Sequence, residues 1–164
     1  IERLLPILTQ KQVKTAVVKH DGHSFEPDVE GTDSYRIRKA GACATAVFCD
    51  THSMVVKQKA GTVKDMLEAV DEADLVLLEG GKNWDFPKIE LVRKGNSERL
   101  VGNGRNLLAV ATDMEGFQVE KAALGTCGRV SEDGSEVPVI ALDGYKKAAD
   151  LILELLAGGQ EAQP

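Results

Sequence analysis

LVLLEGG, residues 75–81, is a run of four apolar residues that gives way at once to a carboxylate and two glycines. A continuous apolar run of this length indicates a strand that is buried on both faces, as in a parallel sheet. TAVVKH (residues 15–20) and LLAVA (residues 107–111) have the same character, and residues 137–142 are expected to form a last strand. We therefore predict a sheet built mostly from parallel strands.

Helices should connect these strands, because the segments around them repeat apolar residues at helical spacing. The apolar residues between Ile1 and Leu8 mark one helical face. Thr62, followed three residues later by Asp65, is typical of a capping box at the start of a helix. The predicted helices lie near residues 1–8, at about residues 32–40, from Thr62 onward, and after Asp143 up to a stop at Gly158 and Gly159.

A hairpin and one further strand complete the expected elements. Residues 44–49 and 53–58 are two short β runs joined by the turn-like Asp50-Thr51-His52, and residues 89–93 alternate as a strand with one wet face. The chain has 164 residues with no internal repeat and no linker. It is therefore predicted to be one domain, residues 1–164, of α/β class, with helices on both faces of a mostly parallel sheet and an added β hairpin.

Composition excludes several classes of protein. Lys and Arg number 20 against 26 Asp and Glu, which gives a net charge of −6 and argues against non-specific nucleic-acid binding. No apolar run is long enough to span a bilayer, and no segment resembles a signal peptide. The three cysteines are odd in number and follow no metal-ligand spacing, so we expect a reducing, cytoplasmic setting and cysteines that fill the core.

Carboxylates stand where the predicted strands end. Ligands of open α/β sheets bind outside the carboxyl ends of the strands. A carboxylate there suits Mg²⁺, which takes one or two protein carboxylates together with phosphate oxygens, and an Asp can also accept hydrogen bonds from guanine. Helix capping and solvated turns are the alternative for any single residue. Together the strand-end carboxylates Asp21, Glu79, Asp113 and Asp143 favour nucleotide binding.

Three segments carry a resemblance to a known family. KHDGHSFEPDVEGTDSYRIRKAGA (residues 19–42), ADLVLLEGGKNWDFPKIELVRKG (residues 73–95) and LLAVATD (residues 107–113) resemble, in the same order, the molybdopterin-guanine dinucleotide biosynthesis protein B (MobB) family. The closing PVIALDGYKKAADLILELL is similar as well. The resemblance implies a three-layer, P-loop NTPase-like fold that binds GTP and Mg²⁺ and forms homodimers. It also implies a partner, the guanylyltransferase that attaches GMP to molybdopterin in molybdenum cofactor biosynthesis.

The chain departs from the family pattern in three places. The phosphate loop, G-x-x-x-x-G-K-[ST], should stand immediately before IERLLPIL and is absent from the 164 residues. We expect the natural protein to continue upstream with a first strand and this loop, and the chain as given to bind GTP weakly or not at all. Gly81 stands where the family usually has an aromatic residue, and residues 116–136 are longer than expected.

The resemblance assigns roles to the matching strand-end residues. Asp21 lies in a switch-like segment and is implied to hold Mg²⁺ through water. Glu79 matches the acidic position that senses the metal and the γ-phosphate, and Gly80 lets the backbone come close. Thr112 and Asp113 occupy the place of the pair that reads guanine. His20 is expected to lie beside the phosphates.

Basic residues form a second candidate site. They crowd one short predicted helix and flank the later strand. In an acidic chain they are candidate docking points for an anionic ligand, here molybdopterin or its dinucleotide product. A solvated helix face is the alternative. The residues are Arg36, Arg38 and Lys39 with Ser34 and Tyr35 in the ligand's path, and Lys82, Lys88, Arg93 and Lys94.

Three functions stay open at this point. The first is a GTP-binding accessory protein, at most a weak GTPase, that acts as an adaptor to the guanylyltransferase. The second is a metallochaperone-type GTPase that delivers a metal through His20, His23 and Cys49. The third is an interaction module that has lost its nucleotide site, which is consistent with the missing loop.

Overall fold

The computed structural model describes residues 1–102, 104–119 and 137–160, and its contacts divide the chain into two compact units. Unit 1 comprises Ile1–Thr15, Ala73–Leu75 and Gly81–Pro164, and unit 2 comprises Ala16–Glu72 and Val76–Gly80. Residues 116–136 form the segment that is longer than the family pattern predicts, and most of it lies outside the described residues. A single domain over residues 1–164 stays a prediction.

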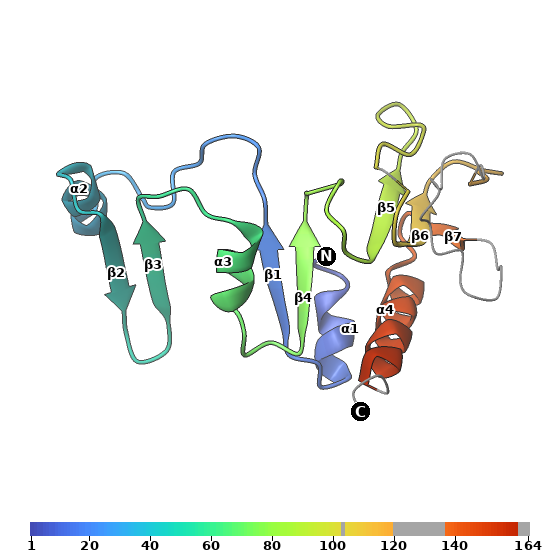
Figure 1. Ribbon diagram of the computed structural model, residues 1–164, viewed down its shortest axis with the longest axis horizontal. Coiled ribbons are helices and arrows are strands. Elements are labelled where there is room, and N and C mark those ends of the chain that lie inside the picture. The colour runs from blue at the N-terminus through green and yellow to red at the C-terminus, as the bar shows by residue number, and fades with distance from the viewer. Residues whose placement is uncertain (103, 120–136, 161–164) are drawn as a thin grey trace. The chain divides into compact units, whose positions relative to one another are not determined.

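Unit 1 is built on a three-stranded sheet in the order β5-β6-β7 (Figure 1). Strands β5 (Lys88–Val92), β6 (Leu107–Thr112) and β7 (Val139–Ala141) are parallel, and Thr112 is in register with Val92 on one side and Ala141 on the other. The central strand is the most buried, as an unbroken apolar run requires. Val92 and Val110 are fully buried at its core.

Two helices pack against each other in the same unit, α1 (Leu5–Gln10) and α4 (Tyr145–Gln160). Leu8 is fully buried, and Pro6 lies in the first turn of α1, where its missing N–H costs little. The predicted stop of the last helix at Gly158 is wrong, because α4 continues to Gln160. A glycine costs only about 1 kcal/mol in a helix interior, and the preceding turns of α4 are anchored by the buried Ile152.

Unit 2 contains β1 (Thr15–Lys19) and β4 (Leu75–Glu79), apart from their first residues, which belong to unit 1. The two strands lie side by side and run in the same direction (Figure 1). Helix α3 (Val63–Glu68) begins with the predicted capping box: Thr62 accepts from the amide of Asp65, and the Asp65 carboxylate accepts from Thr62. These hydrogen bonds from Thr62 lower the pKa of the Asp65 carboxyl.

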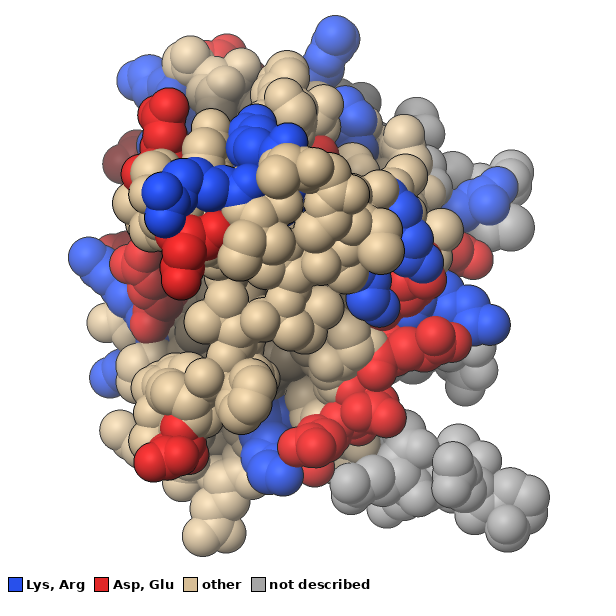
Figure 2. All heavy atoms as spheres, turned by 90° about the vertical axis from the view of Figure 1, so that its left-hand side faces the viewer, with Lys and Arg blue, Asp and Glu red and all other residues tan. Residues whose placement is uncertain are grey.

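The rest of unit 2 is α2 (Asp33–Lys39) and the predicted hairpin of β2 (Ala44–Phe48) and β3 (Ser53–Lys57). The hairpin is antiparallel, with Phe48 opposite Ser53. It exposes large apolar side chains, among them Phe48 at 84% and Val55 at 61%. The hairpin lies at the left-hand side of Figure 1, and Figure 2 shows that side face on. A broad area of uncharged residues there is bordered by charged residues of both signs.

The predicted α/β class with mostly parallel pairing is thus confirmed, and so is the added hairpin. Every strand expected from the sequence is present to within a few residues. In the part of the chain that the structure describes, no helix is long and apolar enough to cross a membrane.

Candidate functional site

The carboxyl ends of β1 and β4 form one charged edge. The backbone N–H of His20 donates to the carbonyl of Glu79 at 2.9 Å, so the two strands end together. Beside this bond, the Lys19 ammonium lies 3.4 Å from the Glu79 carboxylate, and both side chains are about half exposed, at 62% and 49%. An ion pair in such contact with water contributes little to stability. The Glu79 carboxylate can therefore exchange Lys19 for another cation at low cost.

Gly80 turns the chain away directly after Glu79. Its φ of +93° lies in the region that favours glycine, and a Cβ there would stand 2.9 Å from the carbonyl oxygen of His20. A side chain would therefore be both strained and in collision with backbone. At Gly80 the backbone lies close to the end of β1. A close approach of this backbone to phosphates stays a prediction.

Asp21 follows β1 at the same edge. One of its carboxylate oxygens accepts the backbone N–H of His23 at 3.0 Å, which fixes the first turn of the loop. Asp21, two residues after β1, and Glu79, the last residue of β4, therefore supply exposed carboxylates at the ends of two neighbouring strands. This donor set fits Mg²⁺, which is usually coordinated by one or two protein carboxylates, with water or phosphate oxygens as its other ligands.

A closed metal site does not fit the same residues. Within the described ranges, no group of three or more His, Cys, Asp and Glu side chains could hold a metal ion. Structural zinc sites need four such ligands. Among the described residues, His20, His23 and Cys49 are therefore not assembled into the ligand set that the metallochaperone alternative requires.

Thr112 and Asp113 end β6 in unit 1. Thr112 is only 7% exposed, and its hydroxyl accepts the amide of Met114 at 3.0 Å, so it shapes the turn. Asp113 is exposed, and one of its oxygens accepts the backbone N–H of Lys94 at 2.8 Å. That bond orients the Asp113 carboxylate at the strand end. Of the two, Asp113 is the one placed to meet a ligand from solvent.

The predicted basic residues fall into both units and into different environments. In unit 2, Arg36 and Lys39 are exposed, whereas the Arg38 side chain is only 6% exposed and forms an ion pair with Glu26. The hydroxyl of Ser34 lies 3.2 Å from that of Thr32, the N-cap of α2. In unit 1, the predicted residues Lys82, Arg93 and Lys94 are all exposed.

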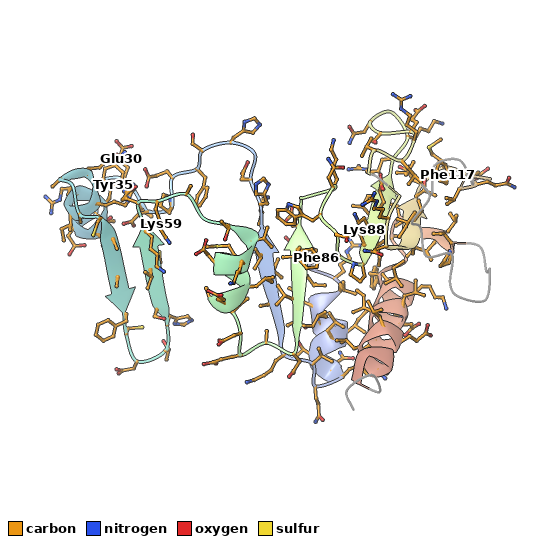
Figure 3. The ribbon with its side chains drawn as sticks, in the orientation of Figure 1. Glu30, Tyr35, Lys59, Phe86, Lys88 and Phe117 are labelled. Carbon is orange, nitrogen blue, oxygen red and sulfur yellow. The ribbon has the colours of Figure 1, made fainter. Side chains whose placement is uncertain are left out.

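Two residues of β5 hold the neighbouring loops: Lys88, which the sequence places among the basic docking residues, and Glu90, which no sequence motif singled out. The ammonium of Lys88 donates to the carbonyls of Lys82 at 3.1 Å and Trp84 at 2.8 Å, and Figure 3 shows where Lys88 lies on β5. Glu90 accepts the amide of Gly102 at 2.9 Å. The signal was the spacing Lys-x-Glu, which puts both side chains on one face of the strand.

The departure at Gly81 has a local explanation. Gly81 has a φ of +60°, and a Cβ there would overlap the ring of Trp84 at 2.2 Å. The amide of Trp84 donates to the carbonyl of Gly81 at 2.8 Å, which closes a turn. In this chain Trp84 therefore supplies an aromatic ring against the backbone at residue 81.

The expectation that the cysteines fill the core is wrong for two of them, because Cys43 and Cys49 are exposed; Cys127 lies outside the described residues. Cys49 stands at the hairpin turn with its sulfur 3.5 Å from the Thr51 hydroxyl, which lies 2.7 Å from Nδ1 of His52. Hydrogen bonds from Thr51, and then from His52, lower the pKa of Cys49 to about 7. A strand-turn-strand pattern predicts a hairpin but not the exposure of its two faces.

Comparison with known proteins places this chain in one family. The family described as Molybdopterin guanine dinucleotide synthesis protein B matches residues 1–113. The crystal structure of Bacillus subtilis MobB has a TM-score of 0.68 at 25% identity and covers 93% of this chain and 86% of that one. This likeness confirms the P-loop-like α/β fold class. The chain belongs to the MobB family.

Two relatives carry the same family name. A molybdopterin-guanine dinucleotide biosynthesis adapter protein of Haemophilus influenzae is 32% identical over 117 residues, which is 69% of this chain and 66% of that protein. The adapter protein of the same name from Escherichia coli is 31% identical over 123 residues, 70% of each. The matched part of the chain thus spans about two thirds of each relative.

Replacing Gly80 should disturb the edge of β1 and β4. We expect Gly80→Ala to lower the free energy of unfolding by at least about 1 kcal/mol, because a Cβ is strained at positive φ and collides with the His20 carbonyl. Gly22→Ala is the matched control, since a Cβ there has no atom within 4 Å. Urea denaturation measures both, and equal stability of the two variants would contradict the close approach.

Alkylation of Cys49 should depend on pH with a midpoint near its pKa of about 7, because the thiolate is the nucleophile. In a variant with Cys43 and Cys127 replaced by Ser, the rate with iodoacetamide should fall as pH drops below that midpoint. Thr51→Val removes the main hydrogen bond and should raise the midpoint toward the ordinary value for cysteine. An unchanged midpoint in Thr51→Val would show that Thr51 does not set it.

Proposed function

We propose that this chain is an adapter in the biosynthesis of molybdopterin guanine dinucleotide, which binds GTP and assists the guanylyltransferase that attaches GMP to molybdopterin. The observation that carries the proposal is the family match over residues 1–113. This range contains the carboxyl ends of β1, β4 and β6, where the candidate residues lie. Hydrolysis of GTP by the chain alone is at most weak in this account.

Asp21 and Glu79 would hold Mg²⁺, directly or through water. The metal would neutralise charge on the phosphate oxygens of the nucleotide. Support comes from the donor set, two exposed carboxylates at the ends of neighbouring strands, and from the half-exposed Lys19 that Glu79 can release. Gly80 and His20 keep the backbone close at this edge.

Asp113 would read guanine, with Thr112 shaping the turn that presents it. A carboxylate can accept hydrogen bonds from N1 and the exocyclic amino group of guanine, and adenine offers no such pair of donors. The hydrogen bond from Lys94 N–H holds one carboxylate oxygen in place, which reduces the conformational cost of binding.

The basic residues would meet the anionic partner of the reaction, molybdopterin or its dinucleotide, and the surface of the guanylyltransferase. They are Arg36, Arg38 and Lys39 with Ser34 in unit 2, and Lys82, Arg93 and Lys94 in unit 1. The exposed apolar side chains of the β2–β3 hairpin support a homodimer, since a two-stranded hairpin is marginal alone. The exposed thiols of Cys43 and Cys49 suit a reducing cytoplasm.

Asp113→Asn tests whether this carboxylate reads the base. The amide keeps an acceptor for Lys94 N–H but puts a donor where guanine also donates, so GTP binding should weaken by about 1–3 kcal/mol. The measurement is calorimetric titration of the full-length gene product with GTP and Mg²⁺. Asp150→Asn, an exposed carboxylate on α4 in the same unit, is the control, and unchanged affinity in Asp113→Asn would remove Asp113 from the site.

A further inference from the structure

The carboxylate of Glu26 lies among three donors, two on α2 and one in the loop before it. One oxygen accepts the backbone N–H of Asp28 at 3.3 Å and pairs with the Arg38 guanidinium, and the other is 3.7 Å from the Lys39 ammonium. Glu26 belongs to the loop between β1 and α2, twelve residues before Arg38. The loop thus places its own anion in a cradle formed by one amide and two cations.

The cations of this cradle are fixed by an aromatic ring. The Arg38 guanidinium lies 5.3 Å and the Lys39 ammonium 5.2 Å from the centre of the Tyr35 ring, which Figure 3 shows on α2. The Arg38 side chain is only 6% exposed, and among the described residues its Nε has no hydrogen-bond partner. A buried donor left unused in this way costs free energy. The site therefore offers more donors than the Glu26 carboxylate takes up.

A phosphate group fits such a cradle better than a carboxylate does. It brings three oxygens and a charge of about −1.5 to −2, and the arginine fork presents Nε and Nη donors to two oxygens at once. Lysine and backbone N–H groups are the other usual phosphate donors. Glu26 is itself 41% exposed, and its neighbour Phe25 is 72% exposed, so little packing prevents the loop from leaving.

We propose that Glu26 is an internal competitor for a phosphate site formed by the Asp28 amide, Arg38 and Lys39. The phosphate group of an anionic ligand displaces Glu26 and frees residues 21–26 of the loop, while Asp28 stays hydrogen-bonded to Thr32, the N-cap of α2. This inference rests on the proposed function, in which α2 meets phosphorylated molybdopterin. It adds that ligand binding at α2 changes the position of the loop that carries Asp21, next to the charged edge formed by the carboxyl ends of β1 and β4.

Glu26→Gln tests the competition with inorganic phosphate as the probe. If Glu26 occupies the cradle about nine-tenths of the time, its removal as a charged competitor should lower the apparent dissociation constant about tenfold. Glu30→Gln is the matched control, because it removes the same charge from the same loop, near Tyr35 in Figure 3. Calorimetric titration at constant ionic strength measures both variants.

Equal phosphate affinity in Glu26→Gln and Glu30→Gln would overturn the proposal, and so would weaker binding in Glu26→Gln. If Glu26→Gln does not fold, Lys39→Gln decides: it should weaken phosphate binding severalfold, whereas Lys64→Gln on α3 should not. Glycerol 2-phosphate tests whether the phosphate of a larger ligand enters, and binding of the free ion alone would contradict a docking role. None of these titrations involves GTP or the transferase, so their failure leaves the proposed function standing.

Discussion

A single backbone hydrogen bond, from His20 N–H to the Glu79 carbonyl, fixes where the charged ends of β1 and β4 lie. Because the strands are parallel and end together, Glu79 at the end of β4 and Asp21 after β1 lie at the same edge. Gly80 can turn there only because it has no Cβ to strike the His20 carbonyl. The position of the carboxylates is therefore a consequence of strand pairing, and any metal chemistry at this edge depends on that pairing.

Two ion pairs in unit 2 differ in the surroundings of their cation, and their roles differ accordingly. Lys19 and Glu79 are both open to water, so their attraction is weak and easily exchanged for that of another cation. Arg38 is almost completely buried against Glu26, so leaving this guanidinium without an anion costs free energy. The first arrangement suits a carboxylate that binds a metal when one is present, and the second suits an anion site that is occupied most of the time.

Much of the fold could be predicted from local sequence, because apolar runs such as residues 75–78 and the Thr62-Asp65 pair determine their structure within a few residues. The Glu26–Arg38 pair could not, since its partners belong to a loop and a helix twelve residues apart with no local pattern joining them. The exposure of Cys49 was missed because hairpin patterning does not say which face is covered. Asp113 was found as a strand-end carboxylate, whereas its contact with Lys94 needed the pairing of β5 with β6.

The central claim, that Asp21 and Glu79 hold Mg²⁺ for a bound nucleotide, is tested most directly by titrating the full-length gene product with GTP in the presence and absence of Mg²⁺. The account predicts that Mg²⁺ strengthens GTP binding in the parent and in Glu68→Gln, a control on the exposed surface of α3. In Glu79→Gln this Mg²⁺-dependent increase in GTP affinity should disappear. GTP affinity without Mg²⁺ should not fall in this variant, because Lys19 no longer pairs with a carboxylate and can face the phosphates. An undiminished Mg²⁺ effect in both Glu79→Gln and Asp21→Asn would contradict the account.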